Sequence, residues 1–446
     1  MEEETKGAPE TFVSAEANGS PEKDLPRKNL SETAKTGKKK NGIWYLVFLC
    51  WFVYTMAYCG RYSYTANIGS IGEYYAVSNG TAGLVSTFFF FVYGAGQIVN
   101  GLLCKRYNKR YVIGGALLIT AISNGVLTLD IPFSCFKWIW LLNGAAQSFL
   151  WSSIMLIIGE NVPLEKLRVA GLVMSTTVAV GKFLSYGAAS LFIRVGNFKW
   201  SFAFGGIVIL IAAILWFATY AKATSGKKQT QKSTGETTKT EKRRVSAVIL
   251  ASVVLLGVLA VVVNLVLDGF MTWMPSILKG YGVDGGVSVA LGMLLPVFGV
   301  IGSFGVTYLN KLVPSYVTLC GILMAVVCAF LATIMGISGA KYWFVVLLCI
   351  CFISCFMTCC NNIITNTAPL FLRKHINSGL LSGVLDGCCY VGSAISAYGF
   401  GSLADNGGWG GVFTVLLIAC GAAVVVAFVF AIVTRKRQRE LQGEND

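Results

Sequence analysis

Apolar stretches long enough to cross a bilayer dominate this sequence. A membrane helix needs about 20 mainly apolar residues, and the 446-residue chain holds twelve candidate stretches. Only 13% of the residues are charged, about half the share usual in soluble proteins. This excludes a soluble globular enzyme, a disordered chain and a nucleic-acid-binding protein. The twelve stretches run over residues 43–64, 81–104, 111–129, 136–159, 169–193, 199–220, 246–275, 287–309, 315–337, 342–368, 378–402 and 409–433.

The positions of Lys and Arg predict the orientation of these spans. With both termini in the cytoplasm, the cytoplasmic segments hold 29 of the 36 Lys and Arg, and the outer loops hold 5. Positive charge accumulates on the cytoplasmic side of membrane proteins. We therefore expect a multi-pass protein of the cell membrane with both termini cytoplasmic.

A polar, basic segment at 222–244 divides the spans into two groups of six. Its composition is typical of a flexible linker. We predict a disordered cytoplasmic tail at 1–42, one six-helix half at 43–221, the linker at 222–244, a second half at 245–434 and a cytoplasmic tail at 435–446. This plan resembles that of major facilitator transporters. The predicted fold is therefore an all-α membrane protein with twelve transmembrane helices in two halves.

The first span carries an aromatic stripe that leads to an arginine. Trp51, Tyr54, Tyr58 and Arg61 recur at three- or four-residue spacing, so they share one helix face. A planar guanidinium matches phosphate or carboxylate, and the stripe therefore suits a central anion-binding cavity. The alternative is an arginine near the outer end of the span that extends to the membrane interface.

Further polar residues lie within other spans, where they are costly in contact with lipid. Lys182 is a second cation in the first half, and Asp268 and Asp386 are acids in the second half. We expect Lys182 to contact substrate, and the two acids to serve proton coupling or gating. The alternative for the charged residues is a set of salt bridges between the halves that closes a gate. The uncharged candidates for substrate binding are Gln97, Gln147 and Trp151.

The loop after the second span, 101–110, is similar to the loop signature of facilitators, although Lys105 stands where that signature has an acid. Arg106 is a candidate gating residue, and simple positive-inside charge is the alternative. A single His in the chain argues against a His-built metal or catalytic site. We expect no metal, no cofactor and no enzyme activity.

Several motifs in order along 43–433 resemble the organophosphate:phosphate antiporter family, which includes glycerol-3-phosphate and hexose-phosphate transporters. They are Tyr58-Cys-Gly-Arg61-Tyr62, Asn143-Gly-Ala-Ala-Gln147 with Trp151, Gly269-Phe-Met-Thr-Trp273-Met-Pro275 and Gly401-Ser-Leu-Ala-Asp405-Asn-Gly-Gly-Trp409. The resemblance implies a phosphate site built on Arg61. It also implies a second arginine that is replaced here by Leu267, beside Asp268, and a lysine that is replaced by Gln97.

We therefore predict a secondary active transporter that moves a small polar anion by alternating access. An organic phosphate such as glycerol 3-phosphate or a sugar phosphate, exchanged for phosphate, is the first hypothesis. A proton-coupled symporter of another solute is the second, and a transporter-like membrane sensor is the third. An appended signalling domain would favour the sensor, and the sequence shows none. The expected partners are a small-molecule substrate and the lipid bilayer, with no nucleic acid, and we expect a monomer.

Overall fold

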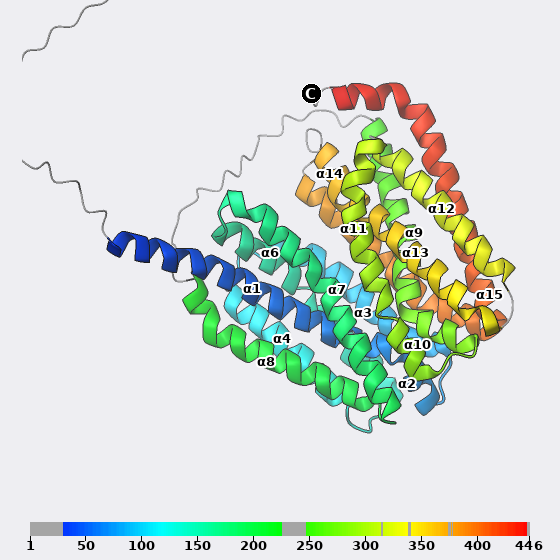
Figure 1. Ribbon diagram of the computed structural model, residues 1–446, viewed down its shortest axis with the longest axis horizontal. Helices are drawn as coiled ribbons and strands as arrows, with labels where there is room; N and C mark the ends of the chain where they lie inside the picture. Colours follow the sequence, from blue (N-terminus) through cyan, green and yellow to red (C-terminus); the bar gives the residue numbers. More distant parts are fainter. Residues whose placement is uncertain are drawn as a thin grey trace, which may run out of the picture. The chain divides into compact units, whose positions relative to one another are not determined.

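The computed structural model describes residues 30–224, 247–313, 315–337, 340–372, 376 and 378–443, and these residues form helices and short connections without a strand (Figure 1). The chain divides into two compact units, residues 1–41 and 42–446. All that follows concerns the second unit. The predicted linker and both predicted tails fall wholly or partly outside the described residues, so the domain boundaries stay a prediction.

The helices before the linker are called the first half here. They are α1 Leu30–Ala66, α2 Ile68–Tyr74, α3 Asn79–Leu103, α4 Lys109–Val126, α5 Phe136–Gln147, α6 Leu150–Asn161, α7 Leu164–Arg194 and α8 Lys199–Thr224. The helices after it are called the second half. They are α9 Ala247–Gly280, α10 Gly285–Leu291, α11 Leu294–Leu312, α12 Tyr316–Gly336, α13 Trp343–Asn362, α14 Ala368–Phe371 and α15 Ser378–Gly443. One π-helical segment, Ile363–Thr367, joins α13 to α14.

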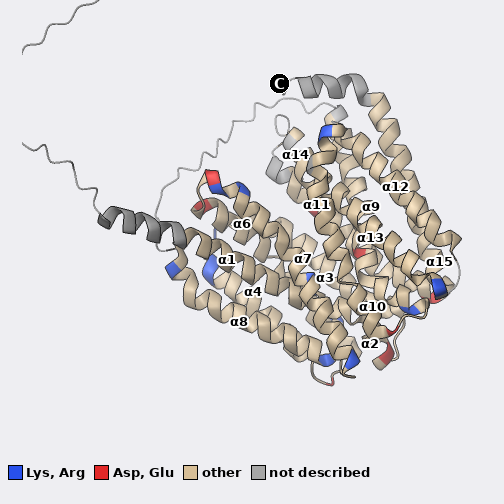
Figure 2. Ribbon diagram, in the orientation of Figure 1, with Lys and Arg blue, Asp and Glu red and all other residues tan. Residues whose placement is uncertain are grey.

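All twelve predicted stretches lie on helices, which confirms the all-helical class. Within the described part of the chain, ten helices are long and apolar enough to cross a membrane. The count differs from twelve for two reasons. The stretch at 111–129 falls on α4, which has only 18 residues and begins with Lys109 and Arg110. The last two stretches both fall on α15, which changes direction at Gly408, where φ is +68°. Basic residues remain sparse along the helices and gather near their ends (Figure 2).

Close contact between α3 and α15 joins the two halves. A Cβ added at Gly83 would lie 2.0 Å from the carbonyl oxygen of Ala397, and one added at Gly401 would lie 2.5 Å from that of Asn79. Lipid is as apolar as the helices, so helix association in membranes depends on such small residues, which let backbones approach. The glycines of α3 and α15 therefore set the distance between the halves.

We expect Gly83→Val to weaken this contact. The valine side chain would overlap the α15 backbone, which cannot yield as a flexible side chain does, and overpacking of this kind costs about 1–3 kcal/mol. The purified variant should show a lower midpoint of thermal unfolding than the wild type. The matched control is Gly115→Val, because a Cβ at Gly115 meets nothing within 4 Å. Equal losses in both variants would show that helix propensity, and not the α3–α15 contact, is responsible.

Polar contacts between the halves concentrate toward the end of the bundle where α2 and α10 lie, called the α2 end here (Figure 1). The Asp405 carboxylate accepts hydrogen bonds from the backbone N–H groups of Asn79 (3.0 Å) and Gly80 (2.8 Å) at the start of α3. Lys279 pairs with Glu73. The structure is therefore closed at the α2 end.

Candidate functional site

Arg61 lies in the interior of the protein, on α1. Its side chain is only 3% exposed. Its Nε donates a hydrogen bond to Oε1 of Gln147 at 2.9 Å, and its Nη2 is buried without a hydrogen-bond partner. A buried charged donor without a partner is costly, so such groups in native proteins call for an explanation. A bound anion would supply the missing acceptor.

Aromatic rings surround the guanidinium of Arg61. Its Cζ lies 4.0 Å from the ring centroid of Tyr93, 4.4 Å from that of Tyr58 and 5.2 Å from that of Phe89. Cation–π contacts of this kind stabilise the positive charge and hold the plane of the group in place. They leave Nη2 as the guanidinium nitrogen that is buried without a hydrogen-bond partner.

A short polar chain fixes Gln147 against Arg61. The Nε2 of Gln147 donates to Oδ1 of Asn143 at 3.0 Å, one helical turn earlier on α5, so its carbonyl oxygen is turned toward Arg61. The helix breaks directly after this point, because α5 ends at Gln147 and α6 begins at Leu150. The break places Gln147 and Trp151 on separate helices, although Phe133–Asn161 as a whole still forms one candidate membrane span, as the sequence pattern predicts.

The other predicted aromatic and amide residues of the first half gather around the same point. Tyr54 contacts Tyr58 at a centroid distance of 5.1 Å and Trp151 at 5.0 Å. Gln97 donates to the hydroxyl of Tyr93 at 2.7 Å. Tyr93 in turn lies edge-on to Tyr390 of the second half, with centroids 4.7 Å apart. The structure thus brings these residues together with Arg61 in what we call the Arg61 cluster.

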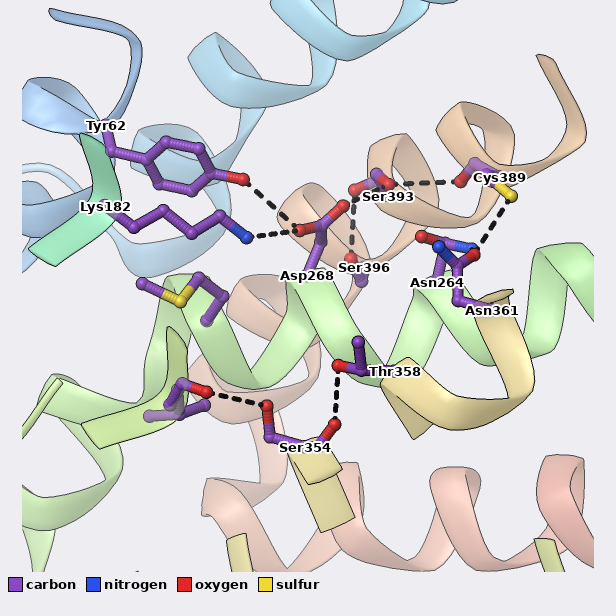
Figure 3. A network of polar contacts seen from close by, with 12 residues as sticks. Tyr62, Lys182, Asn264, Asp268, Ser354, Thr358, Asn361, Cys389, Ser393 and Ser396 are labelled. Carbon is purple, nitrogen blue, oxygen red and sulfur yellow. Dashed lines mark hydrogen bonds and ion pairs between the residues drawn. The ribbon is translucent and has the colours of Figure 1, made fainter. Parts of the chain in front are cut away.

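A second cluster forms around Asp268 of α9, and Figure 3 shows its members. Oδ1 of Asp268 lies 3.8 Å from Nζ of Lys182 on α7 and accepts a hydrogen bond of 3.4 Å from Tyr62 on α1. Oδ2 accepts a hydrogen bond of 2.5 Å from Ser393 on α15. We call these four residues the Asp268 cluster. Lys182 is therefore paired with an acid and is not free beside Arg61.

Tyr62 connects the two clusters, because its ring stacks on that of Tyr58 at a centroid distance of 6.0 Å. On the other side, the polar chain continues deeper into the second half. Asn361 of α13 accepts hydrogen bonds from Asn264 at 2.8 Å and from Sγ of Cys389 at 3.5 Å (Figure 3). A continuous series of polar and aromatic side chains therefore runs from the first half to the second.

The structure does not bring two of the predicted residues into these contacts. Asp386 is half-buried on α15 and lies close enough to Arg61 for an electrostatic interaction, although no ion pair within 4 Å joins it to a described residue. Arg106 is exposed after α3, and none of the described contacts involves its side chain. Its basic neighbours on α4 contact other helices instead. Lys109 lies 3.6 Å from Glu160 of α6, and Arg110 donates a hydrogen bond of 2.7 Å to the carbonyl oxygen of Phe217 on α8.

Ser393 makes the shortest hydrogen bond to Asp268, although the sequence pattern did not single it out. A signal was present, because Asp386, Tyr390 and Ser393 follow one another at i, i+4 and i+7 on one helix face. Phe89 was also missed, and nothing in a row of four consecutive phenylalanines at 88–91 distinguishes it.

Among the described residues, no group of three or more His, Cys, Asp or Glu side chains is placed to hold a metal ion. Away from the helix ends and the α15 kink, the charged side chains that the structure describes are Arg61, Lys182, Asp268 and Asp386. Of the two cations, Lys182 is paired with Asp268, whereas Arg61 makes no ion pair within 4 Å to a described residue.

Comparison with known proteins gives both a family and a set of relatives. The family model described as the Major Facilitator Superfamily matches residues 50–378. The membrane sensor protein UhpC of Escherichia coli K12 is 29% identical over 109 residues, which are 24% of each chain. A probable hexose phosphate transport protein of Chlamydia trachomatis is 27% identical over 116 residues, 26% of this chain and 25% of that protein. The chain thus matches about a quarter of the length of these curated relatives.

Solved structures of transporters share the fold. A peptide transporter in complex with sulfate superposes with a TM-score of 0.71 at 14% identity, covering 89% of this chain and 95% of that one. A bacterial homologue of the human lysosomal transporter Spinster, in an inward-facing and occupied conformation, gives a TM-score of 0.69 at 15% identity. That match covers 88% of this chain and 96% of the other.

Proposed function

The chain belongs to the Major Facilitator Superfamily, and from this premise we propose that it transports a small organic anion whose charged group binds to Arg61. It is a multi-pass membrane transporter and not an enzyme. The proposed substrates are organic phosphates such as glycerol 3-phosphate or a sugar phosphate, exchanged for phosphate. Two relatives are titled probable hexose phosphate transport proteins, which supports this substrate class.

The observation that carries the proposal is the unpartnered Nη2 of Arg61. A guanidinium binds phosphate or carboxylate through two parallel N–H donors in its plane. Here the faces of the group are covered by Tyr58 and Tyr93, and Nε is occupied by Gln147. The remaining edge offers the donors that a phosphate or carboxylate group needs.

Nearby aromatic surfaces suit the body of such a substrate. Tyr54 and Trp151 lie one contact beyond Tyr58, and their rings offer flat apolar faces. Ligand sites commonly combine such faces with a few polar groups that set orientation. We assign Tyr54 and Trp151 to contact with the uncharged part of the substrate. We assign Gln97 the role of holding the Tyr93 side chain in place through its hydrogen bond to the Tyr93 hydroxyl.

The closed α2 end gives the proposed cycle a direction. The positive-inside rule predicts that this end faces outward, because the basic residues at 105–110 and 166–168 lie where α3 ends and α7 begins, at the other end. In this state the Arg61 cluster would exchange substrate with the cytoplasm. Alternating access then requires the Asp405 and Lys279 contacts at the α2 end to break as the other end closes.

Counterflow in proteoliposomes tests the proposal. Vesicles loaded with inorganic phosphate should take up labelled glycerol 3-phosphate or glucose 6-phosphate faster than empty vesicles, and unlabelled substrate should compete. Small carboxylates tested in parallel define the anion class. Failure of every anion to exchange or compete would contradict the proposal.

Proton-coupled symport is the second candidate function, and the Asp268 cluster favours it. An anion that drew Lys182 away would leave Asp268 without its counter-ion, and a buried carboxylate without a counter-ion favours the protonated form. Uptake into vesicles without internal phosphate, driven by an inward proton gradient alone, would support symport over exchange.

A membrane sensor is the third candidate, because two relatives are titled membrane sensor protein. A sensor would bind the anion without moving it. Substrate-dependent thermal stabilisation, together with no counterflow of any anion, would favour that function.

We also propose that the protein lies in the cell membrane as a monomer, with both termini cytoplasmic. Terminal tags probed from each side of the membrane would test the orientation of the termini.

A further inference from the structure

The positive charge of Lys182 is already neutralised within the protein. Its Nζ lies 3.8 Å from Oδ1 of Asp268 and 4.6 Å from the ring centroid of Tyr62. Both members of the ion pair are largely buried, with 17% and 14% of their side chains exposed. Coulomb attraction is strong where water is scarce, so the pair holds Lys182 on the side of the second half.

Asp268 is in turn held from three helices. Lys182 of α7 and Tyr62 of α1 contact one carboxylate oxygen, and Ser393 of α15 donates to the other. Figure 3 shows these partners directed at the carboxylate from different sides. An anion that took Lys182 for itself would leave this carboxylate buried without a cation, which is strongly unfavourable.

The charge available to a substrate is therefore that of Arg61 alone. Arg61 makes no ion pair within 4 Å to any described residue, whereas Lys182 is paired with Asp268. A singly charged anion at Arg61 is matched by one cation. A doubly charged anion leaves one excess negative charge, with the Asp268 carboxylate in the neighbouring cluster and the Asp386 carboxylate within electrostatic reach of Arg61.

We propose that Asp268 determines specificity by charge, so that the transporter selects singly charged anions over doubly charged ones. The proposal rests on the proposed function, because it assumes that the anionic group binds at Arg61. It narrows the substrate class to monoanions such as organic sulfates, phosphodiesters and phosphate monoesters in their singly charged form. Phosphate monoesters have a second pKa of about 6, so most of a monoester population at pH 8 is doubly charged.

Two esters of one sugar test the proposal at pH 8. Glucose 6-sulfate carries one charge and glucose 6-phosphate carries nearly two, while their shapes are similar. The measurement is the concentration of each ester that halves counterflow of a labelled monoanion. In the wild type we expect the sulfate ester to be at least about tenfold more effective, since 1.36 kcal/mol of differential interaction corresponds to a factor of ten.

In Asp268→Asn, Lys182 loses its counter-ion and becomes available to the second charge. We expect the phosphate ester to become about tenfold more effective relative to the sulfate ester than it is in the wild type. The ratio of the two half-inhibiting concentrations is compared between variants, so intrinsic differences between sulfate and phosphate cancel. A ratio unchanged by Asp268→Asn, or a wild type that prefers the phosphate ester at pH 8, would overturn the proposal.

Two further variants act as controls. The double variant Lys182→Gln/Asp268→Asn has the net charge of the wild type, and its ratio should return toward the wild-type value. Asp284→Asn makes the same chemical change at the N-cap of α10, where the side chain accepts a hydrogen bond from Val287 N–H at 3.0 Å. Asparagine also serves as an N-cap, so this variant should keep the wild-type ratio.

Two outcomes separate this inference from the proposed function. If both esters compete and Asp268→Asn leaves the ratio of their half-inhibiting concentrations unchanged, anion transport stands and charge selection by Asp268 fails. If neither ester nor any other anion competes, the proposed function fails and this inference fails with it. Should Asp268→Asn not reach the membrane, Lys182→Gln gives the opposite test. Removing this cation should make the sulfate ester even more effective relative to the phosphate ester than it is in the wild type.

Discussion

Replacing Arg61 with lysine is expected to abolish most transport while the protein still folds and reaches the membrane. The substitution keeps the charge but removes the planar group that contacts Gln147 through Nε and lies over the rings of Tyr58 and Tyr93. Hydrogen bonds to charged groups contribute about 1.5–3 kcal/mol each. We therefore expect kcat/KM for counterflow to fall by about tenfold or more.

The control for this prediction is Arg168→Lys, the same change at an exposed position of α7. That variant should transport at the wild-type rate. Both variants should show similar amounts of protein in the membrane and similar chromatographic profiles in detergent. If Arg61→Lys transports normally, Arg61 has a structural role only, and the assignment of the anion site to this residue is wrong.

Changing Asp268 to asparagine is expected to separate exchange from accumulation. The variant keeps Arg61 and frees Lys182, so exchange of one anion for another should continue. It loses the carboxylate that either receives a proton or restricts the site to singly charged anions. In both cases an inward proton gradient should no longer drive accumulation, whereas the wild type should accumulate substrate several-fold above the external concentration.

The measurement imposes the gradient on vesicles that hold each variant and follows uptake with time. Asp386→Asn is the matched comparison, because Asp386 lies on α15 without an ion pair among the described residues. A wild type that ignores the gradient and exchanges substrate for phosphate one for one would establish antiport and exclude the proton role. If Asp268→Asn accumulates substrate normally, Asp386 becomes the next candidate.

Much of the candidate site could be predicted because polar residues in a membrane helix are rare and costly. That rule alone identifies Arg61, Lys182, Asp268 and Asp386, and the stripe of α1 adds Tyr54 and Tyr58. The rule fails for residues that are neither charged nor unusual in composition. Ser393 is one of many serines in the chain, and Phe89 is one of four adjacent phenylalanines, so only their contacts distinguish them.

The sequence by itself determined that this chain forms membrane helices, and which side chains must face the protein interior. Both follow from hydrophobicity, which depends only on the order of residues along each helix. The tertiary structure alone decided which residues became partners. Lys182 and Asp268 are 86 positions apart, and Arg61 and Gln147 are equally far apart. The periodicity of one helix gives the direction of a side chain but not the helix that it meets. That meeting depends on how the helices rotate and approach, which small residues such as Gly83 set. For this reason the sequence left open whether Lys182 contacts substrate or forms a salt bridge between the halves, and among the described residues the structure pairs it with Asp268.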